Sequence, residues 1–422
     1  MKNSYLIKLI IILIVTPLTS YSFNPALIEE FPESSFLFSE QTDGLVFEVK
    51  EVPKRMIASL EKYPSQYRDE ILFWKRIYTK YPDEVVLIHD KLDLGLIYKV
   101  LNFSKLKKNS RNLVVYEILK NRALRRNVSQ LKNQLKKCNK KCKRELLKNK
   151  KYNTYNLRKN MRTQTGQKDI IERGLGRLKR VQKEISFLFK TTQAKKQWIA
   201  LPFLESSFNE KAISKVNAGG AWQIMPWIGK KLLPKNRYVD GRFNIYLSTL
   251  AAIQLLKQNY RITKSDEIAI IAYNSGLKTF FKTKEKLNKE IITYIDYLNN
   301  ASGKSFGFAS KNFLMEYFAL QESIYPQKLI DQENIKNINF YISRCKTRPK
   351  KVLKILKLRE ENIFKKNNHF KSKSKILSPG QIYITSTKLP NKYYRKVKLS
   401  EIKRKPPSEW IKGTTFKSCS II

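Results

Sequence analysis

Apolar residues along the chain recur mainly at helical spacing. Residues 53–102 carry aromatic side chains three and four positions apart, a pattern that predicts helix. The apolar run 199–204 predicts a buried helix, and residues 248–260 have the periodicity of an amphipathic helix. Two further apolar segments, 268–276 and 306–320, predict buried helices. The pattern therefore favours a mainly α protein whose central part contains almost no strand.

The pattern changes after residue 334. Residues 339–342 predict a short strand, and 379–385 predict a closing strand. Between them, 347–356 and 359–366 predict two helices. Residues 391–422 are basic and contain two adjacent prolines, so we expect a poorly ordered tail there.

The first residues have the layout of a secretory signal peptide. Two lysines accompany the apolar run 9–15, and the small residues Ser20 and Ser22 suit a signal peptidase. The run is short for a membrane span, although an uncleaved anchor is the alternative. We predict a signal peptide over residues 1–22 and an exported protein in the periplasm or cell envelope.

The chain is strongly basic. Lys and Arg total 84 against 35 Asp and Glu, which gives a formal net charge of +49. Such a charge argues for an anionic partner: nucleic acid, an anionic envelope surface or an acidic wall polymer. Because we expect export, we do not expect nucleic acid as the partner. The Lys-rich segment 132–151 predicts a solvated helical arm, and a grip on anionic polymer is its functional alternative.

Cysteine and histidine limit the chemistry further. Cys138 and Cys142, two of four Cys, would share one face of a helix, and export permits a disulfide between them. A zinc site is not expected, because no second Cys pair and no His lie near them. The chain has only two His, His89 and His369, which argues against catalysis by His. We expect neither a metal nor a cofactor.

One carboxylate stands out against its apolar surroundings. Glu205 directly follows the run 199–204. A carboxyl group among apolar side chains loses solvation, which raises its pKa and suits a general acid near neutral pH. A solvated Glu at a helix end is the ordinary alternative. Downstream, Gly219 and Gly220 would let the backbone pass close to a bulky group, and Trp222 would suit the wall of a sugar site.

The order of several motifs resembles one enzyme family. ESSFN at 205–209, AGGAWQIMP at 218–226 and AYNSG at 272–276 resemble the catalytic domain of lytic murein transglycosylases. Within that group, the chain resembles the membrane-bound transglycosylase D type. Segments 73–90 and 167–189 also resemble the helical region that precedes the domain in this type. The resemblance implies a lysozyme-like, all-helical catalytic domain that acts on peptidoglycan.

Most glycosidases use two carboxylates, whereas the resemblance implies a family that works with one acid, here Glu205. Glu205 would protonate the glycosidic oxygen between N-acetylmuramic acid and N-acetylglucosamine. It would then accept the proton of the muramic acid C6 hydroxyl, which closes onto C1 as a 1,6-anhydro ring without water. Asp240 lies in a nearby loop and could be structural. A lysozyme-like hydrolase of the same bond and a catalytically weak peptidoglycan-binding protein are the alternatives.

The resemblance also implies five substrate contacts: Ser214, Gln223, Met225, Tyr273 and Asn274. The serine would help to orient the acid and the sugar, the glutamine would hydrogen-bond sugar groups, and the methionine would pack on the sugar. The Tyr–Asn pair would form the cleft floor. The chain departs from the family pattern at Asn217 and Ala221, beside the glycine turn. It also departs at Phe313, where relatives often carry an aromatic hydroxyl; Tyr317 follows shortly after.

These predictions divide the chain into five parts. They are a signal peptide (1–22), a helical N-terminal region with the Lys-rich arm (23–186), the catalytic domain (187–330), a small C-terminal module (335–388) and a basic tail (389–422). The C-terminal module resembles a degenerate LysM unit, a type of module that binds peptidoglycan, but the usual opening Gly-Asp-Thr is absent. A small family-specific appendage is the alternative for this module.

Overall fold

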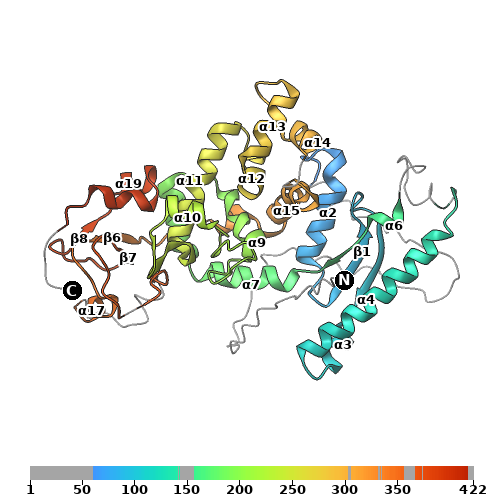
Figure 1. Ribbon diagram of the computed structural model, residues 1–422, viewed down its shortest axis with the longest axis horizontal. Coiled ribbons are helices and arrows are strands. Elements are labelled where there is room, and N and C mark those ends of the chain that lie inside the picture. Colours follow the sequence, from blue (N-terminus) through green and yellow to red (C-terminus); the bar gives the residue numbers. More distant parts are fainter. Residues whose placement is uncertain are drawn as a thin grey trace, which may run out of the picture.

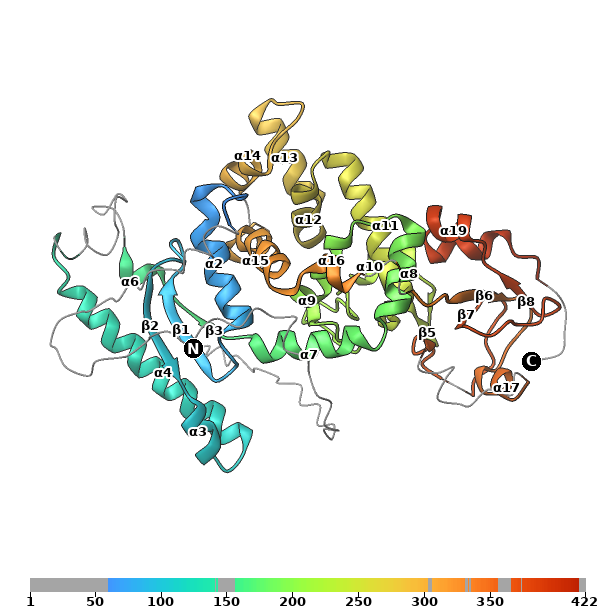
Figure 2. The same cartoon turned by 180° about the vertical axis from the view of Figure 1, so that it is seen from behind.

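The computed structural model describes residues 60–140, 142, 156–302, 306–330, 333, 335–355, 366–372 and 374–416. The molecule is elongated, with a central group of helices between an N-terminal sheet and a C-terminal sheet (Figure 1). Helices α7 (Lys168–Lys179) and α8 (Gln182–Thr192) lead from the N-terminal sheet into the central group (Figure 2). The predicted signal peptide and most of the Lys-rich arm after residue 142 lie outside the described residues.

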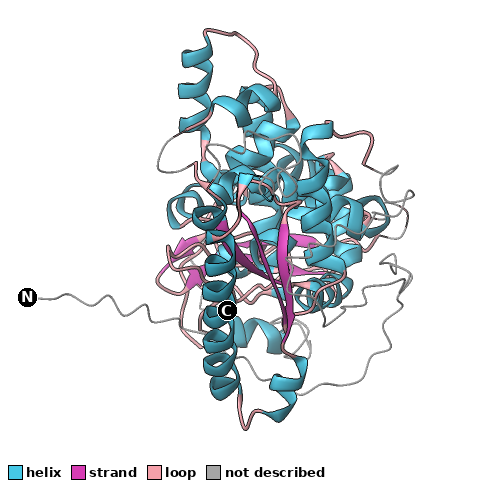
Figure 3. Ribbon diagram, turned by 90° about the vertical axis from the view of Figure 1, so that its right-hand side faces the viewer, coloured by secondary structure: helices cyan, strands magenta, loops and turns pink. Residues whose placement is uncertain are grey.

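The N-terminal region contains a sheet as well as helices (Figure 3). Its antiparallel strands lie in the order β2-β1-β3: β1 is Val85–Asp90, β2 is Ile97–Asn102 and β3 is Met161–Thr165. The prediction of helix over 53–102 is therefore wrong for the described residues beyond α2 (Ser65–Thr79). All six residues of β1 are buried. A short apolar run rich in Val and Ile does not reveal by periodicity alone whether it is a strand or a helix.

Three helices accompany this sheet: α3 (Ser104–Asn109), α4 (Leu113–Lys136) and the short α6 (Leu157–Asn160). Leu131 and Leu135 of α4 pack in one cluster with Ile88 and Tyr98 of the sheet. The exposed positions of α4 include Arg122, Arg125, Arg126 and Lys136. The first part of the predicted Lys-rich arm is therefore an amphipathic helix that is held on the sheet.

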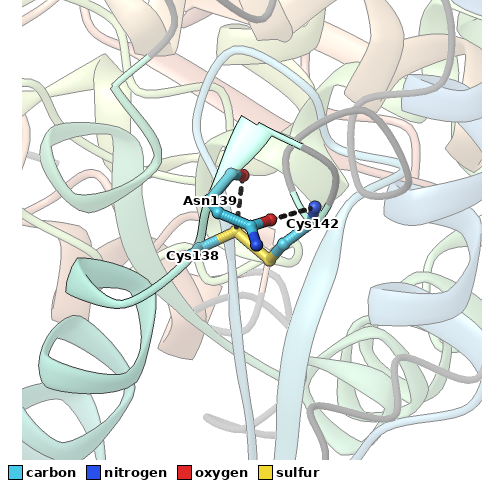
Figure 4. The surroundings of a disulfide bond; sticks show 3 residues. All are labelled: Cys138, Asn139 and Cys142. Atoms are coloured by element: carbon cyan, nitrogen blue, oxygen red, sulfur yellow. Dashed lines mark hydrogen bonds between the residues drawn. A yellow bond between two sulfur atoms is a disulfide. The ribbon is translucent and has the colours of Figure 1, made fainter.

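A disulfide bond joins Cys138 and Cys142 just beyond α4 (Figure 4). Between them, the side-chain oxygen of Asn139 accepts a hydrogen bond from the backbone NH of Cys142 at 3.0 Å. The bond that the sequence allows is thus formed, and it closes a single turn of chain. Cys345 is disulfide-bonded as well.

The central group is helical, with α11, α12 and α15 in its middle (Figure 1). Its elements in chain order are η2 (Lys196–Ala200), α9 (Leu201–Ser206), α10 (Pro226–Leu232), β4 (Lys235–Asn236), β5 (Val239–Asp240), η3 (Gly241–Phe243), α11 (Ile245–Thr263), α12 (Asp266–Ser275), α13 (Leu277–Leu287), α14 (Tyr294–Asn300), α15 (Phe308–Ile324) and α16 (Pro326–Leu329). The buried helices predicted from the apolar runs are confirmed. Ser265 caps α12 by accepting the NH of Ile268 at 3.2 Å, as its place before that helix predicts.

Helix α2 of the N-terminal region packs along α15 of the central group. Trp74 Nε1 donates a hydrogen bond to Asn312 Oδ1 at 3.2 Å, and the Tyr63 hydroxyl donates one to Glu322 Oε1 at 3.0 Å. Both pairs are buried between the two segments. The N-terminal region therefore completes the packing of the central group of helices.

The C-terminal part is a small antiparallel sheet in the order β7-β6-β8 with short helices. The elements are β6 (Asn339–Ser343), α17 (Pro349–Ile355), β7 (Ile382–Thr385), β8 (Tyr394–Lys396), α19 (Leu399–Arg404) and η4 (Pro407–Gly413). The predicted opening strand, first helix and closing strand are confirmed, whereas most of the predicted second helix, 359–366, lies outside the described residues. The basic tail is not poorly ordered up to residue 416. Strand β8 pairs with β6, and Trp410 is fully buried against Phe340.

One continuous core runs through the three parts of the molecule. It includes Ile77 of α2, Leu250 of α11, Leu320 of α15 and Phe340 of β6. The boundaries predicted near residues 187 and 330 therefore separate sequence segments and not separate cores. No helix in the described part of the chain is long and apolar enough to cross a membrane.

Candidate active site

Glu205 lies near the C-terminal end of the short helix α9. Pro202 occupies the first turn, where its missing NH is not needed. The chain then leaves the helix in the left-handed conformation at Ser207 and Phe208, with φ of 51° and 60°. Arg177 Nη1 of α7 donates to the carbonyl oxygen of Ser207 at 2.8 Å, which holds this helix end in place. Glu205 is therefore carried by a short, fixed helix end.

The carboxyl group of Glu205 is poorly solvated. The side chain is half-buried, and burial raises its pKa to about 8, with the charge of Glu316 adding to the rise. Among the described residues, no hydrogen bond reaches this carboxyl group to favour its ionised form. A carboxylic acid with a pKa near 8 still holds its proton at neutral pH and can donate it. This environment differs from that of a solvated Glu at a helix end.

The loop 207–225 folds back onto α9. Ser206 Oγ donates to the carbonyl oxygen of Ala221 at 2.8 Å. Within the loop, the NH of Ala218 donates to Ser214 Oγ at 3.0 Å, and the NH of Ser214 donates to the carbonyl oxygen of Ala218 at 2.9 Å. The Ser214 hydroxyl accepts in this turn and keeps its own proton for another acceptor. The structure thus ties the loop that carries Ser214 to the helix that carries the candidate acid.

The glycine pair of this loop packs against the protein itself. A Cβ on Gly220, whose φ is 78°, would lie 1.9 Å from the carbonyl oxygen of Arg242, and a Cβ on Gly219 would lie 3.1 Å from the ring of Phe243. The expected close approach to a bulky group is therefore present. The group belongs to η3, beneath the loop.

Asp240 and Arg242 form a buried ion pair under the loop. Arg242 Nη2 lies 2.9 Å from Asp240 Oδ2, and the two side chains are only 5% and 4% exposed. Burial alone would raise the pKa of Asp240, but the hydrogen bonds and charge of Arg242 outweigh it and hold the pKa below its ordinary value. Arg242 Nη1 also donates to the carbonyl oxygen of Asn217 at 2.7 Å. Asp240 is thus the anchor of the residue that supports the loop.

Gln223 and Met225 lie at the end of the loop. Gln223 Nε2 donates to the carbonyl oxygen of Gly220 at 2.8 Å, which leaves the amide oxygen as an acceptor for a sugar hydroxyl. Met225 is half-buried at the start of α10, where it is the N-cap residue. Both side chains thus remain partly accessible from the loop side.

The tryptophan expected at the wall of a sugar site is elsewhere. Trp222 is fully buried, and its Nε1 donates to Thr249 Oγ1 of α11 at 2.8 Å. The expectation for Trp222 was wrong because an aromatic residue beside two glycines can face inward as readily as outward. Trp227, in the first turn of α10, is 67% exposed and is the tryptophan of this segment that meets solvent.

Tyr273 and Asn274 end α12, which Gly276 terminates with φ of 77°. The Tyr273 hydroxyl donates to the carbonyl oxygen of Trp222 at 2.8 Å. Burial raises the pKa of Tyr273 well above its ordinary value, and the charge of Glu205 adds to this rise. Asn274 is exposed. The structure therefore brings Tyr273 into electrostatic range of Glu205 and places Asn274 next to it on the surface.

A second carboxylate, Glu316 of α15, acts electrostatically on the candidate acid. The Tyr78 hydroxyl of α2 donates to Glu316 Oε2 at 3.0 Å. Burial raises the pKa of Glu316 to about 7, although the hydrogen bond from Tyr78 and the charge of Arg162 oppose the rise. The sequence analysis gives this residue no role. Its one signal was a Glu inside an apolar helix, the same signal that distinguishes Glu205.

The resemblance implies an aromatic hydroxyl near position 313, where this chain has Phe313. Phe313 and Tyr317 are both buried in α15. Tyr317 interacts electrostatically with Asp266, at the end of α12 opposite to Tyr273. The Tyr78 hydroxyl, on the N-terminal helix α2, contacts α15 at Glu316. Within the described ranges, no group of three or more His, Cys, Asp and Glu side chains could hold a metal ion.

Comparisons with known proteins match part of the chain, including this site, to one family model. Residues 190–295 match the family model described as the transglycosylase SLT domain. The chain is 31% identical over 151 residues to membrane-bound lytic murein transglycosylase D of Escherichia coli strain K12, and equally to that of E. coli O6:H1 strain CFT073. The match covers 35% of this chain and 30% of either relative, so the chain spans less than a third of their length. Glu205 and the five expected substrate contacts all fall between residues 190 and 295, the helical part of the chain that matches the transglycosylase SLT domain.

Proposed function

We propose that the protein is an exported peptidoglycan lytic transglycosylase of the periplasm or cell envelope. It cleaves the β-1,4 bond between N-acetylmuramic acid and N-acetylglucosamine without water and leaves 1,6-anhydro ends. The observation that carries the proposal is the Glu205 carboxyl group, which is half-buried inside the SLT domain with its pKa raised to about 8. Such a group is protonated at neutral pH and becomes a strong base once it has given up its proton.

The reaction needs this one group for both proton transfers. The Glu205 proton goes to the glycosidic oxygen as the bond from that oxygen to muramic acid C1 breaks, and N-acetylglucosamine leaves with a free hydroxyl. The Glu205 carboxylate then takes the proton of the muramic acid C6 hydroxyl, whose oxygen forms the new bond to C1. Glu205 ends in its starting protonation state, and no water is consumed.

The remaining contacts bind and orient the glycan strand. The loop turn leaves the Ser214 hydroxyl proton available, and Gln223 keeps its amide oxygen for a sugar hydroxyl. Met225 would pack against a sugar ring, and Tyr273 with Asn274 would form the floor below it. The net charge of +49 supports attraction to an anionic envelope surface, and the LysM-like module would add a second contact with peptidoglycan.

The proposal is tested by digesting purified sacculi and analysing the soluble fragments by mass spectrometry. We expect muropeptides with 1,6-anhydro-muramic acid ends. Each is lighter than the corresponding hydrolytic product by one water, about 18 Da. Fragments with only reducing muramic acid ends would refute the non-hydrolytic mechanism.

Two specific observations favour other functions. Glu316 is a second carboxylate near Glu205, as a lysozyme-like hydrolase of the same bond would require, and the same digest separates that reaction by its products. Phe313 lacks the aromatic hydroxyl that the resemblance implies at this position, which favours a catalytically weak peptidoglycan-binding protein. Binding to sacculi in a pull-down without release of any fragment would establish that second alternative.

A further inference from the structure

Glu316 lies where three parts of the chain meet. Helix α15, which carries it, packs against both α9 and α2. Tyr78 of α2 is 2% exposed, and its hydroxyl donates a hydrogen bond to Glu316 Oε2 at 3.0 Å. Arg162 of β3 acts on the same carboxylate electrostatically, and its guanidinium lies 4.2 Å from the centre of the Phe308 ring at the start of α15. The N-terminal region therefore acts on Glu316 twice, through the hydrogen bond of Tyr78 and through the charge of Arg162.

The two carboxyl groups have unequal surroundings. Among the described residues, the titratable groups that act on Glu205 are Glu316 and, from α12, Tyr273. Those that act on Glu316 are Tyr78 from α2, Arg162 from β3 and Glu205 from α9. A donated hydroxyl and a cation favour an ionised Glu316, whereas Glu205 receives neither. When the pair holds one proton, that proton belongs on Glu205.

We propose that Glu316, fixed by Tyr78, is a positioning residue that keeps the reactive proton on Glu205 until the glycosidic oxygen takes it. The inference rests on the proposed function, because it assigns Glu205 as the acid. This role of Tyr78 gives α2 a part in the proposed reaction, although α2 precedes the SLT domain in sequence. After the proton transfer, the charge of Glu316 opposes the new charge on Glu205, which makes Glu205 a better base toward the C6 hydroxyl.

The test is the pH dependence of muropeptide release by the parent and by Glu316→Gln. Activity requires protonated Glu205, so the parent should lose activity as the pH rises through about 8. Removing the Glu316 charge should move this alkaline limb down by roughly one pH unit. Release should then be about five-fold slower at pH 8 and nearly unchanged at pH 6, as the fraction of protonated acid requires. The pKa of Glu205 should stay above its ordinary value, because burial is the larger cause and is unaltered.

Tyr78→Phe provides an independent perturbation. Without the hydroxyl, the ionised form of Glu316 loses its donor, and the proton is no longer directed to Glu205. The alkaline limb should move in the same direction as in Glu316→Gln. In the double variant, Tyr78→Phe should add no further shift, because its effect passes through the Glu316 charge.

Glu322→Gln is the matched control. Glu322 lies on the same helix and also accepts a hydrogen bond from a buried tyrosine of the N-terminal region, Tyr63, at 3.0 Å. Its substitution should cost similar stability and leave the alkaline limb unchanged. An unmoved limb in Glu316→Gln, or a loss that is equal at all pH values, would overturn the proposal.

A second measurement separates this proposal from the proposed function. Carbon-13 labelling of Glu carboxyl groups allows the titration of Glu205 to be followed by NMR, with Glu205→Gln identifying its signal. The pKa of Glu205 should be lower in Glu316→Gln than in the parent. If the parent released nothing from sacculi, the proposed function would fail, yet this titration would still decide whether Glu316 controls the proton of Glu205.

Discussion

Replacing the candidate acid should inactivate the protein and stabilise it at the same time. Glu205→Gln keeps the size of the side chain but can neither donate nor accept the reactive proton. General acid–base catalysis contributes about 10²–10⁴-fold, and since one group serves two proton transfers, we expect a loss at or beyond the upper end of this range. The measurement is the rate of release of anhydro-muropeptides from sacculi. A rate near the parent's would show that the site is wrongly assigned.

The gain in stability follows from the raised pKa of Glu205. Burial, with a contribution from Glu316, raises this pKa from 4.5 to about 8, so the folded state holds a proton that the unfolded chain has lost. The free energy of unfolding of the parent therefore falls as the pH rises from 4.5 toward 8. Each pH unit counts about 1.4 kcal/mol, which limits the penalty at pH 7 to about 3 kcal/mol. Because the side chain is half-buried, we expect Glu205→Gln to recover about 1–2 kcal/mol at that pH.

Urea unfolding of both proteins at pH 5, 6, 7 and 8 measures this difference. The advantage of Glu205→Gln should be below about 1 kcal/mol at pH 5 and should grow with pH, because only the parent carries the penalty. A difference that is constant or that shrinks as the pH rises would refute the argument that Glu205 is held protonated by its surroundings.

The remaining predictions concern the support of the loop and the charge of the chain. Asp240→Asn should lower the free energy of unfolding by about 3 kcal/mol or more, because it leaves Arg242 buried without its partner. The folded fraction should still release muropeptides at a rate within a few-fold of the parent's. A loss of activity as large as that of Glu205→Gln would instead favour a two-carboxylate hydrolase. Gly220→Ala should disrupt both stability and activity, because its Cβ would meet the Arg242 carbonyl at 1.9 Å, whereas Gly276→Ala, at φ of 77° in open space, should cost only about 1 kcal/mol by thermal unfolding. Equal effects of the two would contradict the role assigned to Arg242. Binding of Glu205→Gln to sacculi should match the parent's and weaken as salt is added. A pull-down at about 50 mM and about 300 mM salt would test this, because the Debye length shortens from above about 10 Å to below it over this range.

Local pattern predicted the central helices, and together with the resemblance of the ordered motifs it pointed to the candidate acid. Apolar spacing predicts which residues of α11, α12 and α15 are buried, because a helix turns by a fixed angle whatever surrounds it. Glu205 is unusual as a carboxylate at the end of an apolar run, but the run alone leaves a solvated Glu at a helix end as the alternative. Gly220 in the sequence indicated that the backbone passes close to another group, because its backbone conformation is costly for other residues.

Tertiary structure decided what those segments meet. Strands β1 and β2 formed where a helix was expected, because a short buried run takes its conformation from available partners. Likewise β8 is ordered only because β6 offers it an edge, and Trp222 faces inward because Thr249 lies there. The pairing of Glu316 with Glu205 belongs to the same class. It depends on α15 crossing both α9 and α2, and periodicity identifies the buried face of a helix without saying which residues lie against it.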